Sequence, residues 1–145
     1  MFYYQLLYEK ISIPHSFITY FNILYNNIDI NKCVRMDYGE DTLSMQLTME
    51  ALPHWHQWNK ERDEMRLSPV FHETGSLLLC KGNRLSDYER LSIKHVREAG
   101  YGHTIREFQT PESIIEQFPQ FTDAVANGYH TAYLNTAAGK VPILL

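Results

Sequence analysis

The chain has 145 residues, of which 44% are hydrophobic, 13% aromatic and 21% charged, so wholesale disorder is excluded and one folded domain is expected. Thirteen Lys and Arg against 17 Asp and Glu give a net charge of −4, the wrong sign for nucleic-acid or anionic-membrane binding. Two cysteines exclude a disulfide framework, and no apolar run reaches the roughly 18 residues of a transmembrane helix. We therefore expect a soluble intracellular protein with no nucleic-acid or membrane partner.

Residues 1–28 form an atypical N-terminal segment to which we assign no role. Residues 1–30 hold five of the ten tyrosines and three of the seven phenylalanines, but only three charged residues. The segment has neither helical nor strand periodicity, and Pro14 interrupts it. We expect the folded domain to occupy residues 29–145.

Two basic residues follow this segment. Lys32 and Arg35 lie three residues apart, a spacing that places two cations on one side of a helical turn. Such a pair can hold an anionic ligand. The alternative is a solvated basic turn, which the usual surface preference of Lys and Arg favours.

A long helix is predicted to begin at Asp41, which is a suitable N-cap. Pro53 falls inside this helix, where proline costs about 3 kcal/mol, and therefore predicts a kink or a second helix that begins there. Apolar residues recur at spacings of three and four and predict an inward-facing stripe, which comprises Leu43, Leu47, Ala51, Trp55 and Trp58.

Strands and helices alternate in the rest of the chain, without an obvious repeat. Tyr88, Leu91, His95 and Val96 are predicted to lie on one side of the second helix. No closing strand is expected after the last element. The predicted elements are a strand over 76–80, a helix from Ser86 or Asp87 to a stop at Gly100, a strand over 103–108, a short helix from Thr110-Pro111 to Phe118-Pro119, and a final strand over 128–135.

This order predicts a layered α+β or α/β fold, with helices packed on a partial mixed or antiparallel sheet. No metal site is expected from the seven histidines. On a helix, His54 and His56 project about 200° apart, whereas a helical zinc site needs ligands at i and i+4. Cys80 lies in an apolar run and is predicted to be a packed residue rather than a nucleophile.

The sequence resembles the flavin-dependent amine oxidases of the D-amino-acid-oxidase-like superfamily. Among them it most resembles the fungal fructosyl amino acid oxidases (amadoriases), with the sarcosine oxidases next. Five segments in the same order carry the resemblance, and they are Asp29-Ile30-Asn31-Lys32-Cys33-Val34-Arg35, Tyr38-Gly39, Glu50-Ala51-Leu52 with Trp55, Pro69-Val70-Phe71-His72-Glu73-Thr74-Gly75, and Phe118-Pro119-Gln120-Phe121.

The resemblance implies an FAD-dependent oxidase that acts on the C–N bond of a secondary amine or glycated amino acid, with dioxygen as the electron acceptor. In that case Asp29, Asn31 and Lys32 lie against the FAD, and Lys32 also acts catalytically by helping to activate dioxygen. Arg35 matches an arginine near the substrate pocket, where a guanidinium can grip a carboxylate. The resemblance implies a cytoplasmic or peroxisomal location.

The chain departs from the family at both ends. No strand followed by a glycine-rich turn is present to bind the FAD pyrophosphate, and the rest of the substrate domain does not follow Gly139. We therefore expect a fragment of the oxidoreductase fold that lacks the N-terminal Rossmann strand–turn–helix, and FAD binding by it would be weak. The alternative is a catalytically inactive remnant that acts as a binding or interaction domain, and an exposed sheet edge would favour association.

Overall fold

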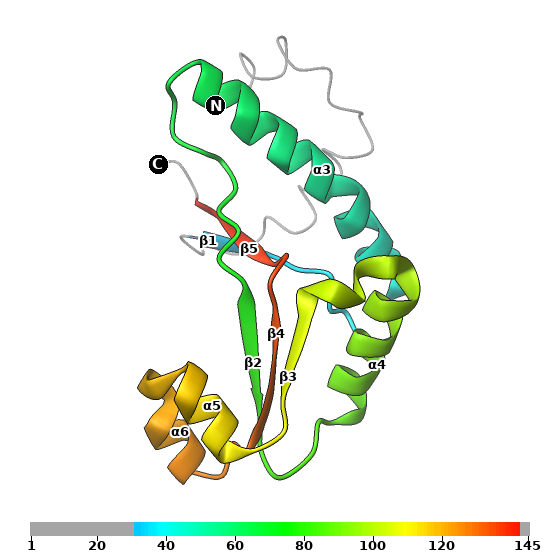
Figure 1. The fold of residues 1–145 in the computed structure, drawn as a ribbon. Helices are drawn as coiled ribbons and strands as arrows, with labels where there is room; N and C mark the ends of the chain where they lie inside the picture. The colour runs from blue at the N-terminus through cyan, green and yellow to red at the C-terminus, as the bar shows by residue number, and fades with distance from the viewer. Residues whose placement is uncertain (1–30, 143–145) are drawn as a thin grey trace. The chain divides into compact units, whose positions relative to one another are not determined.

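A computed structural model of the chain describes residues 31–142, all within one structural unit, so the predicted segment 1–28 and Asp29 lie outside the described residues. Helices and antiparallel strands share this unit (Figure 1). In chain order the elements are β1 (Asn31–Val34), α3 (Thr42–Glu64), β2 (Ser76–Cys80), α4 (Asp87–Val96), a π-helical turn (Arg97–Tyr101), a 3-10 turn (Gly102–Thr104), β3 (Ile105–Phe108), α5 (Pro111–Gln117), a 3-10 turn (Pro119–Phe121), α6 (Thr122–Ala126), β4 (Thr131–Asn135) and β5 (Gly139–Pro142).

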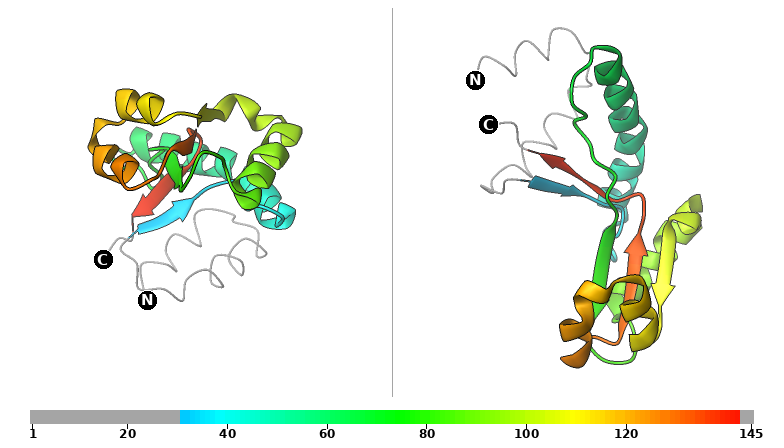
Figure 2. Two further views of the ribbon diagram at one scale, coloured as in Figure 1. Left: turned by 90° about the horizontal axis from the view of Figure 1, so that it is seen from below. Right: turned by 60° about the vertical axis from the view of Figure 1, so that its left-hand side comes forward.

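The strands form two small sheets. One has three strands in the order β2-β4-β3, and the other pairs β1 with β5. Every strand pair is antiparallel, so of the two predicted classes the fold is α+β rather than α/β. Figure 2 shows the two-stranded sheet at the end of the larger sheet where β4 leads into β5.

The central strand β4 decides what each face of the larger sheet contacts. Ala132 lies on one face and packs with Ile114 of α5 and Val125 of α6. Tyr133 and Asn135 alternate with it and are fully buried on the other face. The sheet is therefore apolar toward α5 and α6, and carries two buried polar side chains on its opposite side.

Helix α3 runs through Pro53 as one helix, so the second helix start predicted there as one alternative does not occur. A proline deletes only one backbone donor, and the turns on both sides of it are held by the burial of Leu52 and Trp55. The predicted N-cap is confirmed, because the Asp41 carboxylate accepts the backbone N–H of Ser44 at 2.9 Å.

The predicted apolar stripe of α3 is correct at Ala51 and Trp55, which are buried, but wrong at Leu43, which is 63% exposed. Met45 is buried instead. Residues two positions apart project about 200° apart on a helix, so Leu43 faces outward when Met45 faces the core.

Asn59 ties α3 to the segment that leads into β2. Its Oδ1 accepts the backbone N–H groups of Val70 and Phe71 at 2.9 and 3.1 Å, and its Nδ2 donates to the Phe71 carbonyl at 2.6 Å. These side-chain bonds satisfy the backbone groups of an irregular segment, as pairing with a neighbouring strand would in a sheet. Phe71 is thereby held in the core, where it is 2% exposed.

Helix α4 buries Ser92, Ile93 and Val96, whereas Tyr88 is 42% exposed. The predicted stop is confirmed, since Gly100 has a φ of 88° and ends the helical run within the π-helical turn. No helix in the described part of the chain is long and apolar enough to cross a membrane.

The strand predicted over 76–80 is confirmed as β2, with a buried Cys80, and Thr110 caps α5 with Pro111 at its first position. Two other boundaries shift. β3 begins two residues later than position 103, because 102–104 form a 3-10 turn, and β4 begins three residues later than 128. β4 is also not the final strand, since β5 follows it and pairs with β1, which corrects the expectation that no closing strand follows.

Candidate functional site

The predicted ligand-binding segment is a strand, not a helical turn. In β1, Lys32 lies opposite Val141 and Cys33 lies opposite Lys140. Side chains alternate along an extended chain, so the three-residue spacing between Lys32 and Arg35 does not bring them to one side. The predicted cation pair is therefore wrong. Pairing with β5, a strand more than 100 residues later, overrides the local preference.

The two cations have different surroundings. Lys32 is half-buried within β1, and Asn31 begins that strand. Arg35 follows the strand, and its Nη1 lies 3.4 Å from the Asp37 carboxylate, while its guanidinium stands 5.4 Å from the centre of the Tyr38 ring. Arg35 is thus directed into a network that the sequence analysis did not identify.

Asp37 is the centre of that network. Its carboxylate is 1% exposed and accepts hydrogen bonds from Tyr133 Oη at 3.0 Å and Asn135 Nδ2 at 2.9 Å, in addition to Arg35. A buried carboxylate is tolerated only when such donors replace water. Asp37 therefore joins the segment after β1 to the central strand β4. In the sequence, this arrangement is indicated only by Tyr133 and Asn135, two polar residues at alternate positions of the strand predicted over 128–135.

Helix α4 holds the same segment from its other side. Tyr88 Oη donates to the Asp37 carbonyl at 3.2 Å, and the Gly39 N–H donates to Ser92 Oγ at 2.8 Å. His95 Nδ1 lies 2.8 Å from the Gly39 carbonyl oxygen. Gly39 has a φ of 61°, a conformation that favours glycine. The segment 35–39 is therefore held by both its side chains and its backbone, and this holds Arg35 next to β1.

Electrostatics keeps Tyr133 and Arg35 each in one protonation state. Burial raises the pKa of Tyr133 far above its ordinary value, and the neighbouring negative charge of Asp37 raises it further. Burial opposes the charge on Arg35, but Asp37 and the neighbouring Tyr88, Tyr38 and Cys33 together outweigh it, so the pKa of Arg35 is raised as well. Tyr133 consequently remains a donor and Arg35 a cation.

The raised pKa predicts a loss of stability in alkali. The unfolded state releases the Tyr133 proton above a pH of about 10, while the folded state keeps it, so the contribution of Tyr133 is complete below that pH and is lost above it. In urea unfolding from pH 8 to 11, we expect the stability advantage over Tyr133→Phe to shrink by about 1.4 kcal/mol per pH unit above pH 10. Tyr129→Phe, which removes an exposed phenol, should instead follow the wild type.

Several segments that carry the family resemblance meet beside β1. Trp55 of α3 packs against Phe71 with ring centroids 6.2 Å apart. His72 exchanges two backbone hydrogen bonds of 2.9 Å with Lys140 of β5, and β5 pairs with β1 on its other edge. At Gly139 a β-carbon would overlap the His72 carbonyl and the Phe71 ring. Three of the five segments thus form one cluster around β5, whereas Gly39 of the segment Tyr38-Gly39 is bonded to α4.

The fifth segment lies elsewhere. Phe118 packs edge to face on Phe108 of β3 at 5.5 Å, and Phe121 lies 6.3 Å from Phe118. Phe118 and Phe121 lie in the connection between α5 and α6, the helices on the apolar face of the larger sheet. They contribute to the core around α5, not to the surroundings of Lys32.

The histidines of α3 do not form a metal centre with their neighbours. His56 Nε2 lies 3.7 Å from Glu73, with both side chains about half exposed, and no group of three possible metal ligands occurs within residues 31–142. His54 instead packs near the ring of Trp58, with centroids 6.3 Å apart.

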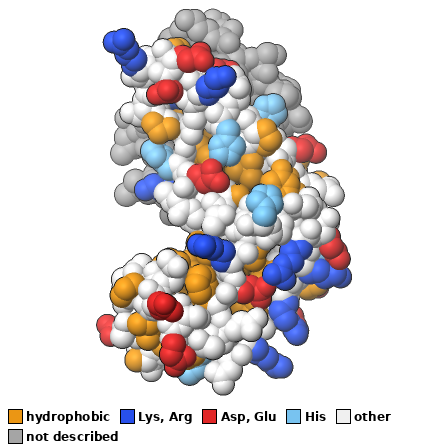
Figure 3. All heavy atoms as spheres, in the orientation of Figure 1, with side chains coloured by type: hydrophobic (Ala, Val, Ile, Leu, Met, Phe, Trp, Pro, Cys, Tyr) orange, Lys and Arg blue, Asp and Glu red, His pale blue; other side chains and the backbone are white. Residues whose placement is uncertain are grey.

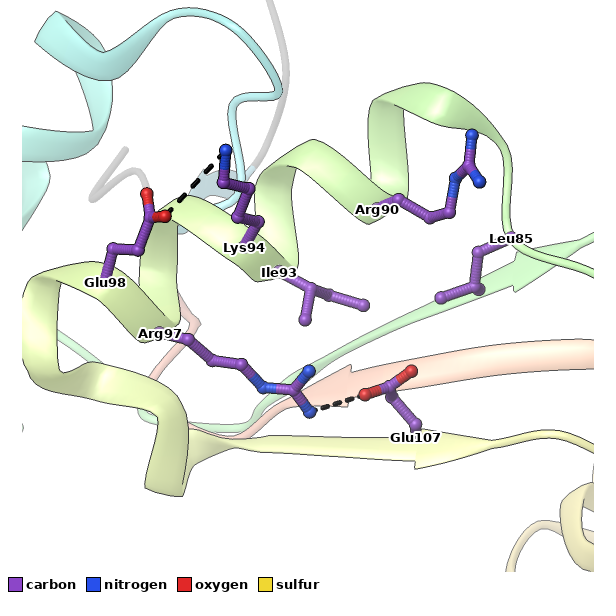
Figure 4. A pocket seen from close by; sticks show the side chains of 7 residues that line it. All are labelled: Leu85, Arg90, Ile93, Lys94, Arg97, Glu98 and Glu107. Carbon is purple, nitrogen blue, oxygen red and sulfur yellow. Dashed lines mark hydrogen bonds and ion pairs between the residues drawn. The ribbon is translucent and has the colours of Figure 1, made fainter.

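A shallow hollow of about 380 Å³ lies between α4 and β3 (Figure 4). Arg97 donates to Glu107 at 2.5 Å, Lys94 lies 3.8 Å from Glu98, and Arg90 pairs with Asp87. Lys and Arg side chains gather over this part of the surface (Figure 3). Their charges are met by these carboxylates, and neither Lys32 nor Arg35 lines the hollow.

No protein-family model matches the chain, and no curated protein matches it.

Of the residues that the family resemblance assigns to FAD, Asn31 and Lys32 lie on β1, and no pyrophosphate site accompanies them within residues 31–142. Lys32 supplies a half-buried cation on β1, next to Asn31. The part that would hold a pyrophosphate, a glycine-rich turn between a strand and a helix, does not occur within residues 31–142. Gly100 and Gly102 follow a helix instead, where Gly100 serves as its stop.

Proposed function

We propose that this chain is a partial member of the FAD-dependent amine oxidases, which oxidise the C–N bond of secondary amines or glycated amino acids with dioxygen. The observation that carries the proposal is the cluster around β5, where motif segments from β1, from α3 at Trp55 and from Phe71-His72 pack together. Motifs that are far apart in the sequence but adjacent in space form the kind of unit that a shared fold would preserve.

Within this proposal, FAD supplies the acceptor for the electrons of the C–N bond. Asn31 and Lys32 would lie against it from β1, and the ammonium of Lys32 would stabilise negative charge that develops there. Arg35 would attract the carboxylate of an amino-acid substrate, while Asp37 fixes the position of its guanidinium. Because residues 31–142 hold no pyrophosphate site, FAD should bind to them weakly and reversibly.

A titration of the purified chain with FAD, followed by flavin fluorescence and absorbance, tests this proposal. We expect saturable binding that Lys32→Met weakens about tenfold, since a lost charge-assisted contact is worth about 1.5 kcal/mol or more. Lys140→Met is the matched control, because Lys140 is an exposed lysine of the paired strand. Wild-type protein that does not bind FAD, or two variants that bind it equally, would contradict the proposal.

A non-catalytic binding domain is the second candidate function. The observation that favours it is the ion pair of Arg35 with Asp37. The Asp37 carboxylate already neutralises the guanidinium that would otherwise bind the carboxylate of a substrate. Under this alternative, FAD titration gives no saturable change. Arg35→Met would then lower the free energy of unfolding without an effect on any flavin signal.

A further inference from the structure

The larger sheet has two outer edges, one at β2 and one at β3, and they differ in charge. β2 is the terminal strand of the order β2-β4-β3, and no strand of the described residues pairs with its outer side. Its sequence, Ser-Leu-Leu-Leu-Cys, contains no charge. An uncharged edge strand offers unpaired backbone donors and acceptors to any further strand, and proteins usually protect such an edge with charge or proline.

The opposite edge of the sheet is protected in this way. β3 carries Arg106, which is exposed, and Glu107, which pairs with Arg97 at 2.5 Å. Charged side chains on an edge strand disfavour its pairing with another chain. Strand addition to the described sheet is therefore directed to β2.

The leucines of β2 also retain surface to bury. Leu77, Leu78 and Leu79 are all only half-buried, whereas Thr131, Ala132 and Tyr133 of the neighbouring β4 are buried. Leu77 and Leu79 pack on the side of α5 and α6, and Leu78, opposite Tyr133, lies on the other side. Both faces of the strand thus leave part of a leucine uncovered at the edge.

We propose that β2 pairs antiparallel with β2 of a second copy of this chain, which joins two three-stranded sheets into one. Directly opposed residues lie on the same face of a sheet, so the two-fold axis must pass midway between two copies of the same residue. The axis at Leu78 pairs the whole strand, and it places Leu78 against Leu78 of the second copy and Leu77 against its Leu79. The half-exposed leucines then cover one another.

Charge at the two ends of the strand favours this orientation. Glu73 precedes β2, and its side chain is 44% exposed, while the exposed Lys81 follows it directly. Antiparallel pairing brings the acidic end of each strand beside the basic end of the other, whereas parallel pairing would place like charges together. A two-fold contact of this kind also closes at two copies, so a dimer is expected and a fibre is not.

Sedimentation of the full chain over a range of concentrations tests the dimer. We expect a concentration-dependent species with twice the chain's 17.1 kDa mass. A chain that stays monomeric at all concentrations would overturn the proposal. An open-ended series of larger assemblies would overturn it equally, as would a dimer that forms elsewhere.

Disulfide trapping identifies the contact without disturbing the fold of the monomer. In a Cys33→Ser background, Leu78→Cys should form a covalent dimer on mild oxidation, because directly opposed β-carbons are about 4.5–5.5 Å apart. Arg106→Cys on the β3 edge is the matched control, since it is more exposed and favours random collision. Equal cross-linking of the two variants, or none at position 78, would refute pairing through β2.

Discussion

Asp37→Ala is expected to lower the free energy of unfolding by about 3–5 kcal/mol, the range for removal of one partner from a buried charged network. The substitution leaves Tyr133 Oη and Asn135 Nδ2 buried without the acceptor that they now share. It also leaves Arg35, one-third exposed, without its carboxylate. Urea unfolding followed by circular dichroism measures the change.

The exposed Asp63 near the end of α3 provides the matched control, and Asp63→Ala should change stability by less than about 0.5 kcal/mol. The double variant Asp37→Ala/Tyr133→Phe sharpens the test. Because the tyrosine hydroxyl is unsatisfied once Asp37 is gone, its further removal should cost much less than it costs in the wild type. If Asp37→Ala costs no more than Asp63→Ala, the network does not hold the segment after β1.

Gly139→Ala should be comparably damaging, with a loss of about 3 kcal/mol or more, because the new methyl group meets atoms that cannot move aside. A β-carbon at Gly139 would overlap the carbonyl of His72 and lie 2.5 Å from the Phe71 ring. That carbonyl is bonded to the Lys140 N–H at 2.9 Å, so withdrawal of the 71–72 segment breaks its pairing with β5.

The same substitution at Gly102 separates close approach from the general cost of replacing glycine. The nearest atom to a β-carbon there is Cγ of Arg97 at 3.0 Å, part of a flexible side chain that can turn away. Thermal unfolding should therefore show a large decrease in melting temperature for Gly139→Ala and a small one for Gly102→Ala. Similar values would show that the segment 71–72 yields easily.

The two variants also separate the two halves of the candidate site. Asp37→Ala acts on the link between the segment after β1 and the larger sheet, whereas Gly139→Ala acts on the contact of β5 with residues 71–72. If Lys32 binds FAD as proposed, both changes should weaken that binding indirectly, since each loosens a support of β1. Lys32→Met would weaken binding without a comparable loss of stability.

Parts of the fold followed from local sequence because their physical causes are local. Asp41 and Thr110 cap helices through hydrogen bonds to residues three positions ahead, and Gly100 stops a helix through its own left-handed backbone. The uncharged run over 76–80, bounded by glycines, was sufficient to place β2. In each case the interaction lies within a few residues of the position that it determines.

Composition, the caps and β2 were thus determined by the sequence alone, together with the alternation of helices and strands, whereas the antiparallel pairing decided for α+β over α/β. Only the tertiary structure decided that residues 31–34 form a strand, that Arg35 meets Asp37, and that position 139 has no room for a side chain. Asp37 is bonded to residues 96 and 98 positions away. Such partners are unreadable from local patterns, because β1 becomes a strand only when β5 returns beside it.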